Sequence, residues 1–128
     1  MSLLPTHQEP STVAGPVRRF KDPAYQPLAD TLGALRQKID DLDDQIVTLL
    51  AQRGRYVRDA TRFKLDDFQV SAPHRQAEVF QRVRALAVQR ENAFPDFADI
   101  IESTYRTLVA GFVAGEARCF QETERTEP

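Results

Sequence analysis

Residues 31–63 read TLGALRQKIDDLDDQIVTLLAQRGRYVRDATRF, and this stretch decides the fold of the chain. It contains no proline, and its apolar residues recur at alternating steps of three and four. Such spacing predicts one long helix with a single apolar seam, and we expect Asp30 to cap the start of that helix. The seam consists of Leu32, Leu35, Ile39, Leu42, Ile46 and Leu49.

A helix of about 33 residues is roughly 50 Å long at 1.5 Å per residue. A chain of 128 residues forms a single domain by its length. A domain of that size cannot bury so long a seam by itself, although helices in water depend on such burial. The seam therefore needs a partner helix, and we expect a second copy of the chain to supply it.

Two further helices are expected after residues 65–73, which break the pattern. Pro73 suits the first turn of a helix, and this second helix fades near residues 90–93. Pro95 opens a third helix that continues to Phe120. The predicted fold is all-α, with three helices in the order long, short, long, forming an intertwined helical homodimer. The supporting apolar residues are Val79, Val83, Leu86, Ile101, Tyr105, Leu108 and Phe112.

The chain divides into three parts by composition. Residues 1–27 hold five of the eight prolines and no helical periodicity, which predicts an extended proline-rich arm. Residues 28–121 carry the helical domain, and residues 122–128 form a short polar tail.

Composition and charge argue against several classes of protein. The 17 basic and 19 acidic side chains leave a net charge of −2, whereas nucleic-acid binders usually carry a basic excess. No apolar run approaches the roughly 18–20 residues of a membrane span, and the start of the chain lacks the pattern of a secretory signal. We therefore expect a cytoplasmic protein that binds neither nucleic acid nor membrane.

The potential metal ligands are sparse or scattered. Cys119 is the single cysteine, so no intrachain disulfide can form, which suits a reducing compartment. His7 and His74 are too few and too far apart for a zinc or iron site. The acidic side chains of residues 40–44 point to different sides of a helix. No metal and no cofactor are expected.

Charged residues stand where the apolar seams predict leucine. Continued by the same steps, the apolar seam of the first helix reaches Arg53 and Lys64. The apolar stripe of the third helix, which contains Leu108 and Phe112, reaches Glu116 in the same way. A buried charge needs a counter-charge or a ligand, so these side chains predict a polar pocket between helices. Arg36 lies roughly 26 Å from Arg53 along a straight helix, so it can serve only a neighbouring chain's pocket. The alternative is a helical dimerisation module in which the seam charges form structural salt bridges.

Three stretches of the sequence, residues 32–64, 72–87 and 105–120, resemble the all-helical (type II) chorismate mutases, a family that includes the isochorismate pyruvate lyases. The resemblance covers about residues 31–121 and rests on the elements LRxxID, LLxxR, RFK and APxR in that order. The RFK and APxR elements are particularly similar to the branch that contains the lyases.

The resemblance implies a dimer with two shared sites that bind a small dicarboxylate. Arg53, together with Arg36 from the partner subunit, would clamp the two carboxylates of the substrate. Lys64 would donate a hydrogen bond to the ether oxygen whose bond to the ring breaks. Arg75 would support the carboxylate cluster, and Gln76 would lie near the ring hydroxyl.

Glu116 would be the second group at the ether oxygen, where well-known bacterial members often have glutamine. Position 76 departs as well, because some mutases have glutamate there. An ionised carboxylate only accepts hydrogen bonds, so Glu116 must be protonated to help the ether oxygen. Burial disfavours the carboxylate, whereas the nearby Lys64 ammonium favours it, and the sequence leaves both states open.

The expected function is that of a chorismate mutase, which rearranges chorismate to prephenate by a pericyclic reaction without a cofactor. The first alternative is an isochorismate pyruvate lyase, which splits isochorismate into salicylate and pyruvate. An aminodeoxychorismate mutase is a further alternative. Gln76 favours the mutase, whereas the RFK and APxR elements favour the lyase. The pathway that the reaction serves, in aromatic amino acid, siderophore or antibiotic synthesis, is not fixed by the residues.

Overall fold

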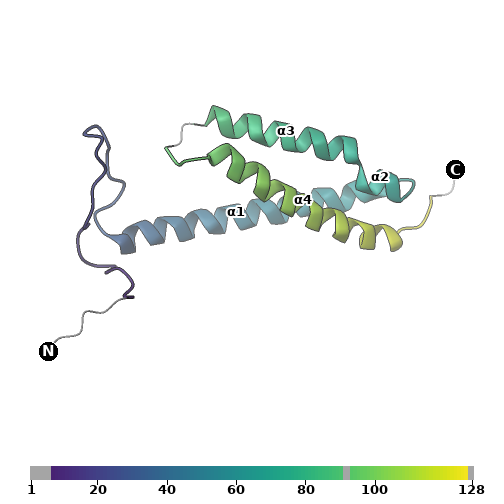
Figure 1. The fold of residues 1–128 in the computed structure, drawn as a ribbon. Helices are drawn as coiled ribbons and strands as arrows, with labels where there is room; N and C mark the ends of the chain where they lie inside the picture. The colour runs from purple at the N-terminus through teal and green to yellow at the C-terminus, as the bar shows by residue number, and fades with distance from the viewer. Residues whose placement is uncertain (1–6, 91–92, 127–128) are drawn as a thin grey trace. The chain divides into compact units, whose positions relative to one another are not determined.

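A computed structural model of the chain describes residues 7–90 and 93–126, and the regular structure over these ranges is entirely helical (Figure 1). The predicted all-α class and the long, short, long order of the main helices are confirmed. None of the helices in these ranges is long and apolar enough to span a bilayer. The elements are α1 (Leu32–Ala60), η1 (Thr61–Phe63), α2 (Asp67–Ser71), α3 (Pro73–Gln89) and α4 (Phe97–Gln121).

The start of α1 differs by one residue from the expected cap. The Thr31 hydroxyl accepts a hydrogen bond from the Ala34 amide at 3.2 Å. A capping side chain reaches the amide three residues ahead, and Thr31 directly precedes the first helical residue, Leu32. The prediction that Asp30 caps this helix is therefore wrong.

The arm contacts the first turn of α1. The Gly33 amide donates a hydrogen bond to the Thr12 carbonyl oxygen at 2.9 Å. A Cβ atom at position 33 would lie 2.9 Å from the same oxygen, closer than real Cβ contacts. Glycine therefore permits this contact between arm and helix. Within the arm, the rings of Phe20 and Tyr25 lie 4.7 Å apart between centroids.

The chain divides into two compact units within α1, after Leu50. In the first unit, the apolar seam of α1 faces solvent: Ile39, Leu42, Ile46 and Leu49 are all more than half exposed. No residue of α1 is buried. The isolated chain thus leaves the seam without the cover that such a stripe requires.

In the second unit, α3 and α4 lie side by side (Figure 1), and α4 also contacts α2 and η1. Ion pairs tie α3 to α4 on the outside: Arg84 of α3 lies 2.7 Å from Asp99 and 3.3 Å from Glu102. Arg106 contacts Glu102 at 3.0 Å from within α4. The buried apolar residues of this unit are Val70, Val79, Ala87 and Val109.

In the second unit, the sequence predicted the start of α3 correctly, placed the start of α4 too early and did not predict α2. Helix α3 begins at Pro73 as predicted. Helix α4 begins at Phe97 rather than at Pro95, because Asp96 adopts a left-handed conformation with φ 59° and separates the proline from the helix. The five-residue helix α2 was not predicted, because so short an element has no detectable periodicity.

The ion pairs between α3 and α4 predict a loss of stability in acid. The hydrogen bond from Arg106 is the main cause that lowers the pKa of the Glu102 carboxyl below its usual 4.5, and Arg84 acts in the same direction. A lowered pKa contributes stability above the unfolded value, and this contribution is lost as pH falls through the folded pKa. Glu102→Gln should therefore reduce the fall in Tm, followed by circular dichroism, between roughly pH 5 and pH 3.

Glu124→Gln makes the same charge change in the exposed tail and serves as the control. Equal acid sensitivity of the wild type, Glu102→Gln and Glu124→Gln would contradict the prediction.

Candidate active site

One pocket of the second unit, with a volume of about 320 Å³, brings together five of the six side chains that the sequence singled out. Arg53 comes from α1, and Lys64 follows η1. Arg75 and Gln76 come from the first turn of α3, and Glu116 comes from α4. Side chains that are far apart in the sequence thus share one concave surface, where they lie among apolar side chains.

Arg36, the sixth of these residues, does not line this pocket. It lies in the first unit and is exposed on α1. Its expected role in a neighbouring chain's site therefore stays a prediction.

The Glu116 carboxyl is the buried polar group at the centre of the site, with its side chain only 6% exposed. Its Oε2 atom lies 3.7 Å from the Lys64 ammonium and 3.3 Å from the Thr61 hydroxyl. Both neighbours can donate hydrogen to that oxygen. Glu116, which interrupts the apolar stripe of the third helix, is thus buried and has hydrogen-bond partners, as burial of a carboxyl group requires.

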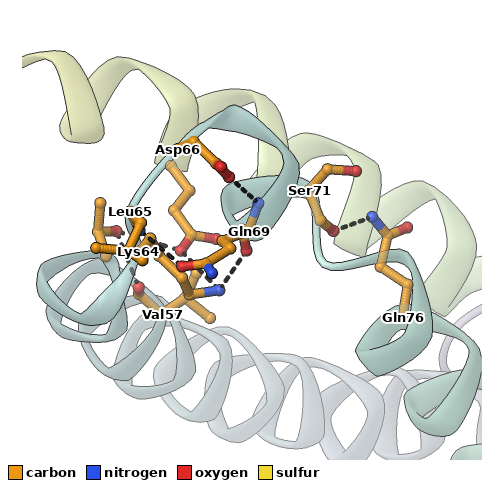
Figure 2. A network of polar contacts seen from close by, with 9 residues as sticks. Val57, Lys64, Leu65, Asp66, Gln69, Ser71 and Gln76 are labelled. Carbon is orange, nitrogen blue, oxygen red and sulfur yellow. Dashed lines mark hydrogen bonds and ion pairs between the residues drawn. The ribbon is translucent and has the colours of Figure 1, made fainter.

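The Lys64 ammonium is held by the short segment that follows it. Its Nζ atom donates a hydrogen bond to the Gln69 carbonyl oxygen at 2.9 Å, as Figure 2 shows. Two further hydrogen bonds fix Gln69. Its backbone amide donates to the Asp66 carboxylate at 2.9 Å. Its side-chain oxygen accepts a hydrogen bond from the backbone amide of Leu65 at 2.7 Å. Helix α2 therefore orients the ammonium instead of leaving it on a loose loop.

The sequence contains a pattern that predicts how Asp66 and Gln69 hold this segment. Asp66 and Gln69 have the spacing of a capping box, in which an acidic or hydroxyl residue is followed three positions later by Glu or Gln. In the structure, Asp66 caps α2, and Gln69 reaches back to the amide of the residue before the cap. Sequence reasoning missed both residues because it treated the segment as irregular.

The Arg53 guanidinium is positioned by aromatic rings of α4. Its Cζ atom lies 5.5 Å from the ring centroid of Phe112 and 5.9 Å from that of Tyr105. The Phe112 ring approaches α1 closely because position 54 is glycine: a Cβ there would lie 2.9 Å from Cε1 of the ring. Stacking on aromatic faces limits the freedom of a guanidinium, so Arg53 is held before any ligand binds.

Gln76 and Arg75 contribute differently to the pocket. The Gln76 side-chain amide donates to the Ser71 carbonyl oxygen at 2.6 Å (Figure 2), which leaves the amide oxygen as an acceptor. Arg75 is mostly exposed and lies 3.8 Å from Glu78. Ala72 joins α2 to α3 with φ 45°, a left-handed conformation that costs a non-glycine residue roughly 1–2 kcal/mol. This strained turn places Gln76 beside Ser71.

The arrangement suits an anionic guest. Arg53, Lys64 and Arg75 supply three cations against the single carboxyl group of Glu116, and no described group of three or more His, Cys, Asp or Glu side chains could hold a metal ion. Fixed donors in a partly water-excluded pocket stabilise charge that develops on a bound molecule. The site can therefore bind carboxylates and stabilise a developing oxyanion.

Comparison with known proteins agrees with these features. The family model described as chorismate mutase type II matches residues 35–117, a range that contains all six side chains. An isochorismate pyruvate lyase from Pseudomonas aeruginosa is 28% identical over 92 residues, which cover 72% of this chain and 87% of the relative. The resemblance inferred from the sequence elements is confirmed.

The contact between Gly54 and Phe112 predicts a specific coupling in stability. Alanine in a helix interior is favoured over glycine by about 1 kcal/mol, but a Cβ at position 54 meets the Phe112 ring. Gly54→Ala should therefore give no gain in the wild type and a gain of about 1 kcal/mol in the Phe112→Leu background. Urea unfolding of the four proteins measures this coupling, and additive effects would contradict it.

Proposed function

Because the chain belongs to the chorismate mutase type II family, we propose that it rearranges chorismate to prephenate in the pocket that contains Arg53, Lys64 and Glu116. The observation that carries this proposal is the Lys64 ammonium, which lies 3.7 Å from the buried Glu116 carboxyl and is fixed by the Gln69 carbonyl. Two oriented hydrogen-bonding groups thus meet at one place in a cationic pocket. Hydrogen-bond donors at the ether oxygen would accelerate a pericyclic ether cleavage by stabilising the charge that develops there.

The reaction is an internal rearrangement in which atoms and electrons balance within one molecule. The bond between the ring and the ether oxygen breaks while the enolpyruvyl methylene carbon forms a bond to the ring. Negative charge builds on the ether oxygen, where the Lys64 ammonium donates a hydrogen bond that is stronger in the transition state than in the ground state. Arg53 binds a carboxylate and holds the substrate in its compact reactive conformer.

Glu116 acts in this proposal as a neutral acid that donates to the same ether oxygen. As a carboxylate it could only accept hydrogen bonds and would repel the developing charge. Its side chain is only 6% exposed, and a dianionic substrate would bring further negative charge into the pocket. Gln76 offers its free amide oxygen to the ring hydroxyl, since its amide nitrogen is engaged by the Ser71 carbonyl.

The proposed enzyme is a homodimer. The apolar seam of α1 is more than half exposed at Ile39, Leu42, Ile46 and Leu49, and a seam of this kind is stable only when it is covered. A second copy carries the same seam and satisfies the requirement symmetrically. Arg36 of the partner subunit, on this seam's helix, then supplies the second carboxylate-binding cation.

The second candidate function is the isochorismate pyruvate lyase reaction. It is favoured by the Pseudomonas aeruginosa relative, whose name carries this activity. The same bond to the ether oxygen breaks, but a ring hydrogen moves to the enolpyruvyl methylene carbon, so that salicylate and pyruvate form. Lys64 and Arg53 would have the same roles, because the carboxylates and the ether oxygen are common to both substrates.

Assays of the purified protein with chorismate and with isochorismate test the proposal. We expect a higher kcat/KM with chorismate, and Lys64→Ala should lower kcat by about 10²–10³ because it removes a preorganised donor. Lys21→Ala, on the exposed arm, is the matched control and should retain activity. A much higher kcat/KM with isochorismate would reverse the order of the two candidates. No turnover of either substrate by a folded dimer would favour a purely structural dimerisation module.

Subunit mixing tests the shared site. Arg36→Ala and Lys64→Ala should each have very low activity alone, yet their heterodimer contains one pocket with every wild-type residue. Statistical exchange should therefore restore about one quarter of wild-type activity.

Lys64→Ala mixed with Glu116→Ala is the control for this exchange. Both changes lie in the same pocket, so each heterodimer site lacks one of the two groups and activity should not return. No recovery in the first mixture, with exchange verified by mass, would contradict a site built from two subunits.

A further inference from the structure

Thr61 is a buried hydroxyl residue to which neither the apolar seams nor the family resemblance gives a role. Its exposed fraction is 1%, and it belongs to η1, directly after α1. The hydroxyl oxygen lies 3.3 Å from the Val57 carbonyl oxygen and 3.3 Å from Glu116 Oε2. A hydroxyl has one hydrogen, so Thr61 can donate it to only one of these two oxygens.

The Lys64 ammonium identifies the acceptor oxygen of Glu116. Its Nζ atom lies 3.7 Å from Oε2, the same oxygen that Thr61 approaches. An ammonium can only donate hydrogen, so a proton on Oε2 would face the hydrogens of Lys64. Oε2 is therefore the oxygen that accepts, and Thr61 donates to it. When Glu116 is a neutral acid, its proton resides on Oε1.

We propose that Thr61 is a positioning residue, which donates its hydroxyl hydrogen to Glu116 Oε2 and so fixes Oε1 as the oxygen that presents the acidic proton to the substrate. This inference rests on the proposed function of the pocket. The two oxygens of a carboxyl group are equivalent until their surroundings distinguish them. Here Thr61 and Lys64 both lie close to Oε2, which makes the two oxygens of Glu116 different. The hydrogen bond also replaces water at a carboxyl group that is 6% exposed.

The electrostatic surroundings of Glu116 are defined by few groups. Lys64 is its direct neighbour, and Arg53, Arg75 and Tyr56 line the same pocket from α1 and α3. Directly before α2, the Asp66 carboxylate accepts a hydrogen bond from the backbone amide of Gln69. Because Thr61 is uncharged, its removal changes the hydrogen bonding of Glu116 without changing the charge of the pocket.

Two effects of losing the hydroxyl follow from this geometry. Without the donor, the carboxyl group loses its fixed orientation, and misplacement of a reacting group lowers the rate. A hydrogen bond to a carboxylate is stronger than one to a neutral acid. Loss of the hydrogen bond from Thr61 therefore favours the neutral form of Glu116. Activity that depends on neutral Glu116 should then persist to higher pH.

Thr61→Val and Thr61→Ser form the matched pair for the test, because valine keeps the shape without the hydroxyl and serine keeps the hydroxyl. Two measurements are made over pH: kcat with chorismate, and the ¹³C shift of the Glu116 carboxyl carbon, identified by its disappearance in Glu116→Gln. For Thr61→Val we expect kcat to fall about tenfold at low pH, and both midpoints to move to higher pH. Thr61→Ser should match the wild type in both.

An unchanged midpoint in Thr61→Val would overturn the proposal, because a merely structural role changes stability and not the titration. A lower midpoint would also overturn it, since Thr61 would then accept the Glu116 proton. Thr61→Cys, with a weak donor, replaces valine if that variant does not fold. The carbon shift is measured without substrate. If the wild type shows no turnover, the proposed function is therefore contradicted, whereas the titration still decides the role of Thr61.

Discussion

The burial of one carboxyl group is the constraint around which the second unit is organised. Removing a carboxylate from water costs several kcal/mol unless hydrogen bonds and counter-charges replace the solvent. Glu116 is 7% exposed and receives Thr61 from η1 and Lys64 from the segment after it. Lys64 in turn depends on α2 through the Gln69 carbonyl. The segment from η1 through α2 therefore carries and orients both donors that reach Glu116 of α4.

The first unit obeys a different constraint, which is the length of its helix. The seam of α1 extends well beyond the residues that the pocket uses, and its apolar side chains stay in water within one chain. Such a surface is stable only in contact with another apolar surface. In the proposed homodimer, a second copy covers this surface, and Arg36 of the partner subunit would bind the substrate at the pocket that contains Arg53. Assembly and catalysis would then depend on the same helix.

Hydrophobic periodicity was sufficient to predict α1, α3 and α4, because each is long enough to repeat its stripe several times. It also located Arg53, Lys64 and Glu116, because a charge inside an apolar stripe must find a partner. The capping hydroxyl of Thr31 and the turn at Asp96 depend on local backbone angles, which periodicity does not contain. Thr61 was missed for another reason: threonine fits both a helix end and an apolar contact, so only its neighbours in space reveal its use.

The choice of glutamate rather than an amide at position 116 has a chemical consequence. A neutral carboxylic acid is a stronger hydrogen-bond donor than an amide, but it donates only while it is protonated. The Lys64 ammonium lies 3.7 Å from this carboxyl group, and the proposed reaction requires the neutral form of the group. Glutamine would donate at any pH, whereas glutamate would make the proposed activity depend on pH, and the proposed hydrogen bond from Thr61 would orient the group that carries this dependence.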